Sequence, residues 1–173
     1  MLFNLRIFHK ILPVKGIKAS LLAEDEVHDL AILGIKGVRL KPLVLEKTHS
    51  VKEGYRVAFT GYPIGFILGL NPTTHTGIIS AIAPIILPGP SAGIIDGNLI
   101  KYLKNPFNIF QIDATAYPGN SGSPVYRVST GKVVGVINMV FIKSKKEYIL
   151  KEPTGITYAI PVEFIRKLNQ SIP

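Results

Sequence analysis

Short apolar runs rich in β-branched residues make up most of this 173-residue chain, and glycine, proline, asparagine or charged residues separate them. Runs of about four to eight residues bounded by turn residues are typical of β-strands. Only Val162–Gln170, after Pro161, has apolar residues at helical spacing. The sequence therefore predicts an all-β fold with a short C-terminal helix. The predicted strands cover residues 3–12, 18–23, 29–33, 56–60, 74–82, 109–113, 123–127, 133–140 and 157–159.

Residues 57–95 contain no Asp, Glu, Lys or Arg, which raises the question of a membrane span. The apolar pieces at residues 57–70 and 78–87 are each shorter than the roughly 18 residues that a spanning helix needs. The polar sequence NPTT at residues 71–74 separates them. We interpret the stretch as buried strands and predict no transmembrane segment.

The chain carries 20 Lys and Arg against 11 Asp and Glu, a formal net charge of +9. This excess favours acidic surfaces, nucleic acid or anionic lipid in general. We interpret Lys143, Lys145, Lys146 and Lys151 as the solvated tip of a hairpin. Because no basic stripe is interleaved with aromatic residues, no specific nucleic-acid partner is predicted. The absence of Cys excludes disulfides and a cysteine nucleophile, and the wide spacing of the four His predicts no metal site.

The segment DATAYPGNSGSP at residues 113–124 is the part of the sequence whose residue types most clearly suggest a reactive site. A serine held in a tight turn between glycines, as Ser121 is, can present its hydroxyl while nearby backbone N–H groups converge on one point. Such a turn can attack a carbonyl and stabilise the oxyanion that forms. Taken alone, the sequence Gly-Asn-Ser-Gly is also ordinary turn chemistry. The nucleophile elbow of α/β-hydrolases does not fit, because Ser123 stands where its final glycine should be.

Several segments spread along the chain form an ordered set of motifs. They are VHDLAIL at residues 27–33, RVAFTGYPIG at 56–65, TGIISA at 76–81, QIDATAYPGNSGSP at 111–124 and GITYAIP at 155–161. Together these segments resemble the trypsin-like serine peptidases and, within them, the HtrA/Deg-like branch. The order of the motifs is far more specific than any one of them.

The resemblance implies two packed antiparallel Greek-key β-barrels with the active site in the cleft between them. Residues 1–55 would be the C-terminal part of the first barrel, which is incomplete, and residues 56–173 the second barrel with the C-terminal helix. Together they would form one peptidase domain. The resemblance also implies a polypeptide substrate and no cofactor. Family analogy allows an oligomer and a periplasmic or extracytoplasmic location, although the chain itself reveals neither.

Carried over residue by residue, the resemblance makes Ser121 the nucleophile of an acyl-enzyme mechanism. Asp29 would be the acid that orients the catalytic imidazole. The backbone N–H groups of Gly119 and Ser121 would form the oxyanion hole. Small or medium apolar side chains are expected before the scissile bond, because no acidic residue frames the primary substrate pocket. The residues that would frame it are Thr115, Ala116, Val136, Ile137 and Asn138.

The general-base histidine of the family has no convincing counterpart in this sequence. Only His9 and His28 precede Asp29. His28 is the strand neighbour of the acid, and successive side chains of a strand point to opposite faces. His9 lies in a predicted strand, whereas the family carries the base on a turn. The simplest interpretation is that the chain is truncated at its N-terminus. Two hypotheses stay open: a fragment of an active serine endopeptidase, or a catalytically degenerate relative that binds peptides.

Overall fold

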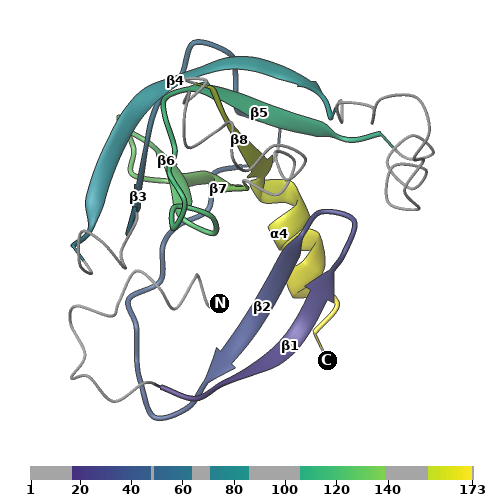
Figure 1. Cartoon of the computed structure of the whole chain (residues 1–173). Coiled ribbons are helices and arrows are strands. Elements are labelled where there is room, and N and C mark those ends of the chain that lie inside the picture. The colour runs from purple at the N-terminus through teal and green to yellow at the C-terminus, as the bar shows by residue number, and fades with distance from the viewer. Residues whose placement is uncertain (1–16, 48, 64–70, 86–105, 139–155, 173) are drawn as a thin grey trace, which may run out of the picture.

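The computed structural model describes residues 17–47, 49–63, 71–85, 106–138 and 156–172 (Figure 1). Where the prediction falls on these residues, the expected strands and the helix are confirmed, with small shifts at the strand ends. The predicted strand at residues 3–12, the last residues of the strand at 133–140 and the lysine-rich hairpin tip lie outside the described residues. No helix in the described part of the chain is long and apolar enough to cross a membrane.

Six strands of the described chain form a closed antiparallel barrel (Figure 1). In chain order they are β3 (Arg56–Gly61), β4 (Thr73–Pro84), β5 (Asn108–Asp113), β6 (Pro124–Arg127), β7 (Val133–Ile137) and β8 (Ile156–Pro161). Around the barrel the order is β3-β4-β5-β8-β7-β6. Phe59 of β3 lies opposite His75 of β4 on one side and Val125 of β6 on the other. Closure leaves the barrel without an unpaired edge strand.

Alternate side chains of these strands point inward and fill the barrel. Val57 and Phe59 of β3 are fully buried, and Ile79 of β4 and Ile112 of β5 belong to the same apolar cluster. β-Branched and aromatic side chains suit these positions because they pack well on a pleated sheet. Each such burial contributes about 1.5–3 kcal/mol. The barrel is therefore the well-packed part of the fold.

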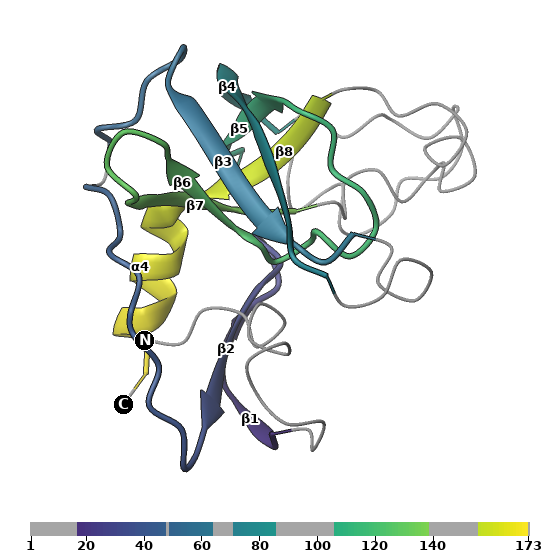
Figure 2. The same ribbon diagram turned by 90° about the vertical axis from the view of Figure 1, so that its left-hand side faces the viewer.

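A separate two-stranded sheet is formed by β1 (Ala19–Asp25) and β2 (Leu30–Ile35). The two strands are antiparallel, and Asp25 at the end of β1 lies opposite Leu30 at the start of β2. Figures 1 and 2 show this hairpin beside the barrel, on the side where the C-terminal helix lies. Much of β1 is exposed, including Leu21 at 54 %. The hairpin has little core of its own, so it depends on its neighbours.

The helix α4 (Val162–Gln170) joins the hairpin to the barrel. Its residue Phe164 belongs to an apolar cluster with Ile160 of β8, and Val27 and Leu30 of the hairpin pack against this cluster. Leu30 also packs against a second cluster that contains two further residues of the helix. The start of β2 is therefore held where the helix and the barrel meet.

Candidate active site

Residues 117–123, called the Ser121 turn below, belong to the connection from β5 to β6. The N–H of Gly122 donates a hydrogen bond to the carbonyl of Ile137 at 2.8 Å. The N–H of Ile137 in turn donates to the carbonyl of Ser123 at 2.9 Å. These bonds join the residues directly after Ser121 to the end of β7. Ser121 itself is half-buried, so its position is fixed while its side chain stays within reach of solvent.

The backbone amides of the Ser121 turn fall into two groups. Those of Asn120, Gly122 and Ser123 donate hydrogen bonds to backbone carbonyls. Those of Gly119 and Ser121 have no acceptor within the described part of the chain, and the Ser121 hydroxyl has no partner there either. Gly119 has a φ of 103°, in the left-handed region that favours glycine. Two unpaired N–H groups next to a half-buried hydroxyl can bind a carbonyl oxygen and stabilise negative charge on it.

The side chain of Asn120 supports the turn from the inside. It is fully buried, and neither of its polar atoms has a hydrogen-bond partner among the described residues. It lies against Gly61 at the end of β3, where an added Cβ atom would stand 2.6 Å from Oδ1 of Asn120 and 2.5 Å from Oγ of Ser123. Only glycine leaves room for this approach. The end of β3 therefore helps to set the position of the turn.

One imidazole lies close to the Ser121 turn, on the strand β4. The His75 ring stacks on Phe59 with centroids 5.1 Å apart, and the ring of Tyr117 lies 5.9 Å away on the side of the turn. Nε2 of His75 is buried without a partner in the described part of the molecule. Burial lowers the pKa of His75 below its ordinary value of 6.5. No sequence pattern predicts the stacking of His75 on Phe59, because it depends on the pairing of β3 with β4.

Asp29 lies in the turn between β1 and β2 and is exposed. The sequence pattern placed it in the following strand, but β2 begins at Leu30. The backbone of Asp29 has a φ of 50°, which Asp tolerates better than most residues because its short side chain can bond locally. The expectation that His28 and Asp29 alternate on a strand was therefore wrong, since both residues precede β2.

The hairpin that contains Asp29 packs against an apolar cluster with a residue of β8, and the Ser121 turn is hydrogen-bonded to β7. Leu30, next to Asp29, and Tyr158 of β8 pack against the same apolar cluster. The carbonyl of Tyr158 accepts a hydrogen bond from the N–H of Asn138 at 3.0 Å, directly after β7. Ile137, which precedes Asn138, is the residue whose backbone is hydrogen-bonded to the Ser121 turn. A short series of contacts thus links the neighbourhoods of the two predicted catalytic side chains.

The residues predicted to frame the substrate pocket lie before the Ser121 turn and at the end of β7. Thr115, Ala116 and Val136 are half-buried. Asn138 is 4 % exposed, and Ile137 is 1 % exposed with its side chain in the barrel core. Ile137 meets the Ser121 turn through its backbone rather than its side chain. Their role in substrate binding stays a prediction.

The other histidines of the described chain are engaged elsewhere. His28 contacts Asp25, with Nδ1 and Oδ2 2.6 Å apart, and His49 lies 3.4 Å from Glu163. No described imidazole is hydrogen-bonded to Ser121, and His9 lies outside the described residues. The described part of the chain also contains no group of three or more His, Cys, Asp or Glu residues that could hold a metal ion.

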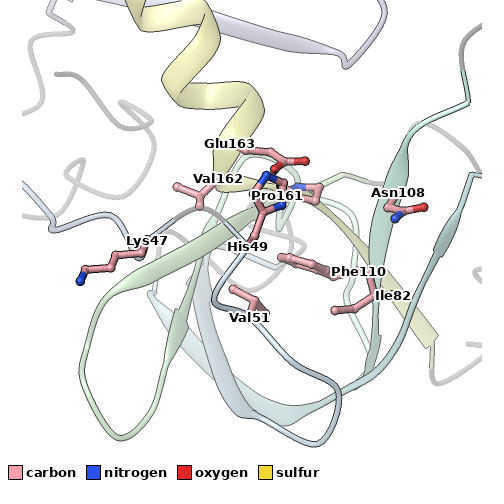
Figure 3. Close-up of a pocket in the computed structure, with 9 residues that line it drawn as sticks. All are labelled: Lys47, His49, Val51, Ile82, Asn108, Phe110, Pro161, Val162 and Glu163. Carbon is pink, nitrogen blue, oxygen red and sulfur yellow. Dashed lines mark ion pairs between the residues drawn. The ribbon is translucent and has the colours of Figure 1, made fainter.

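A cavity of about 190 Å³ opens at the other end of the barrel (Figure 3). It lies where β5 begins and β8 ends, whereas the Ser121 turn follows the end of β5. Figure 3 shows His49 and Glu163 facing each other at its rim. No residue predicted for catalysis or substrate binding lines it. Its lining consists of Lys47, His49, Val51, Ile82, Asn108, Phe110, Pro161, Val162 and Glu163.

Comparison with known proteins identifies the family. The family model described as "Trypsin-like peptidase domain" matches residues 12–136, so the chain belongs to the trypsin-like peptidases. A probable periplasmic serine endoprotease DegP-like from Pseudomonas fluorescens is 30% identical over 156 residues, which cover 90% of this chain and 27% of that relative. The serine protease Do-like HtrA of Bacillus subtilis is 27% identical over 157 residues, covering 90% of this chain and 30% of its own length.

Solved structures agree with this assignment. The structure of the HtrA-type protease AlgW with a decapeptide matches with a TM-score of 0.65 and 28% identity, covering 90% of this chain and 40% of that one. The predicted family, its HtrA branch and the trypsin-like fold are therefore confirmed. The chain spans between about a quarter and a third of the length of the two curated relatives.

Proposed function

We propose that this chain is a serine endopeptidase domain that acts through an acyl-enzyme on Ser121, with Asp29 as the acid. The observation that carries the proposal is the Ser121 turn, in which the amides of Gly119 and Ser121 are unpaired while those around them are bonded. We also propose that residues 1–55 belong to a first barrel, that residues 56–173 form the second, and that the two together form one domain.

In this mechanism the Ser121 hydroxyl attacks the scissile carbonyl carbon, and its proton passes to a general base. The carbonyl oxygen becomes an oxyanion that accepts hydrogen bonds from the N–H groups of Gly119 and Ser121. The carbon–nitrogen bond then breaks as the base returns the proton to the leaving amine, and water hydrolyses the resulting ester. Loss of one such donor costs about 2.7–4 kcal/mol of transition-state stabilisation.

We propose that His28, His49 and His75 are not the general base. The Nδ1 of His28 is bound to Asp25, and His49 pairs with Glu163 at the end of the barrel away from the Ser121 turn. The ring of His75 stacks on Phe59, and its buried Nε2 has no hydrogen-bond partner among the described residues, Ser121 included. The base is then either His9 or an imidazole that this sequence does not contain.

The proposed substrate is an extended polypeptide with a small or medium apolar side chain before the scissile bond. This choice rests on the residues Thr115, Ala116, Val136, Ile137 and Asn138, none of which carries a charge for a basic or acidic substrate side chain. The HtrA-type protease AlgW was solved with a decapeptide, which supports a peptide ligand here by analogy. Main-chain pairing with the strand that the sequence predicts at residues 133–140 would bind such a peptide.

A second candidate function is peptide binding without cleavage. It is favoured by the lack of an imidazole bonded to Ser121 among the described residues. Without a base the serine hydroxyl stays protonated, and only the oxyanion site and substrate binding would contribute to the rate.

The test measures cleavage and binding of a mixed peptide library by the wild-type chain, by Ser121→Ala and by Ser129→Ala as a matched control. We expect cleavage by the wild type and by Ser129→Ala, whose serine is exposed, and none by Ser121→Ala. Peptide binding without cleavage, unchanged in Ser121→Ala, would establish the second candidate instead.

A further inference from the structure

A carboxylate fixes the turn that contains Asp29 from within. Asp25, the last residue of β1, accepts hydrogen bonds through Oδ1 from the N–H groups of Val27 and His28, both at 3.1 Å. Its second oxygen, Oδ2, lies 2.6 Å from Nδ1 of His28. Because a carboxylate only accepts, the imidazole is the donor in this contact. One side chain therefore fixes both the backbone and the ring of the residue directly before Asp29.

The His28 ring is packed against two aromatic side chains that come from distant parts of the sequence. Its centroid lies 3.9 Å from that of Phe164 on α4, with the planes 24° apart, and 4.4 Å from that of Phe107. The two phenylalanines also meet each other, at 5.2 Å. The side chain of His28 is 16% exposed. This packing fastens the hairpin turn to the helix and to the segment that leads into β5.

Asp29 has no comparable contacts of its own. It is exposed, and its carboxylate has no hydrogen bond among the described residues. Its backbone φ of 50° is uncommon for residues other than glycine and, although Asp tolerates it better than most, it is favoured only under a constraint from the surroundings. The neighbours supply that constraint, since His28 is stacked on Phe164 and Leu30 is packed against the apolar clusters of α4. The backbone is thus held on both sides of Asp29, while its carboxylate has no partner among the described residues and can bind another group.

We propose that His28 is a positioning residue for Asp29, and that Asp25 orients His28 for this task. This inference rests on the proposed function, in which Asp29 is the triad acid. His28 would act through its contacts with Asp25, Phe107 and Phe164, and not through proton transfer with the substrate. A displacement of a catalytic group by about 1 Å can lower the rate about 10²-fold.

The first test is a double-mutant cycle on peptide hydrolysis by the full chain. His28→Ala should lower kcat about 10²-fold with little change in KM, and His28→Asn, which keeps a donor for Asp25, should recover part of the loss. In an Asp29→Asn background, His28→Ala should cause no further loss, because no carboxylate remains to be positioned. Equal losses of kcat in both backgrounds, or a change in KM alone, would overturn the proposal.

The second test needs no activity and measures amide hydrogen exchange. His28→Ala should abolish protection of the amides of residues 27 and 28, which donate to Asp25, while those of β3 keep theirs. His49→Ala is the matched control, because His49 also pairs with a carboxylate but is 84% exposed; it should change neither kcat nor exchange at the turn. Unchanged exchange in His28→Ala, or the same change in His49→Ala, contradicts the proposal.

The two tests separate the two proposals. If the wild-type chain neither cleaves peptide nor reacts with a fluorophosphonate at Ser121, the proposed function fails, and His28 can no longer position a triad acid. Loss of protection at residues 27 and 28 in His28→Ala would then still show that His28 holds the turn. Cleavage by the wild type with unchanged exchange in the variant would instead leave the proposed function standing and reject the role of His28.

Discussion

The barrel and the hairpin hold the two predicted catalytic side chains in different ways. Ser121 stands in a turn that is hydrogen-bonded to β7 and packed on Gly61 of β3, so a closed sheet determines its position. Asp29 stands in an exposed turn of a two-stranded sheet, and a hairpin of that size is marginal alone. The position of Ser121 therefore depends on sheet geometry, whereas that of Asp29 depends on side chains from other elements that pack against its neighbours.

The largest expected effect comes from a substitution in the hairpin that alters charge and little else. Asp29→Asn should lower kcat for peptide hydrolysis about 10⁴-fold, because the amide cannot orient and stabilise the catalytic imidazole as a carboxylate does. The melting temperature should hardly change, since the side chain is exposed. Steady-state kinetics and thermal unfolding of both proteins check this. An unchanged kcat, in a chain that cleaves peptide, would show that Asp29 is not the acid.

A smaller effect is expected where the barrel is most tightly packed. Gly61→Ala should lower the free energy of unfolding by about 1–3 kcal/mol, because the new methyl group meets Asn120 and Ser123. The matched hairpin variant is Gly34→Ala, where the nearest atoms to the new Cβ would belong to the exposed side chain of Leu22, at 3.1 Å. That variant should stay within about 0.5 kcal/mol of the wild type. Urea unfolding measures both, and equal losses would remove the contrast between the two regions.

The smallest effect concerns pH and the barrel side of the site. Burial lowers the pKa of His75 below 6.5, so the unfolded chain binds its proton more readily than the folded one. The stability from this group is complete above about pH 6.5 and is lost as the pH falls through that value toward the lowered pKa. His75→Gln should therefore flatten the pH dependence of unfolding below neutrality. Urea unfolding at a series of pH values checks this, and an unchanged pH dependence in His75→Gln would contradict it.

Local patterns in the sequence predicted the elements of the fold better than the contacts between them. The β-branched runs and the turn residues around Ser121 are patterns that span only a few neighbouring residues. The strands and the helix Val162–Gln170 lie where these patterns predict them. The fit of Asn120 against Gly61 and the stacking of His28 on Phe164 join residues that are far apart in the chain. No short-range pattern carries such information.

The conformation of Asp29 illustrates the same limit. The apolar run that follows Asp29 favoured a strand position for it. Instead, the hydrogen bonds from the N–H groups of Val27 and His28 to Asp25 form a turn, and the strand begins after Asp29. The acidic residue before the turn competes for backbone N–H groups that a strand would otherwise pair. That competition is local, but its outcome depends on Phe107 and Phe164, which hold the His28 ring.

The most direct test of the account is the reaction of the chain with a fluorophosphonate, followed by intact-mass measurement and peptide mapping. We expect one phosphonyl group per chain, attached to Oγ of Ser121 and absent from Ser121→Ala. An adduct on another residue, or no adduct on a folded chain, would contradict the claim that this hydroxyl is the nucleophile beside an oxyanion site.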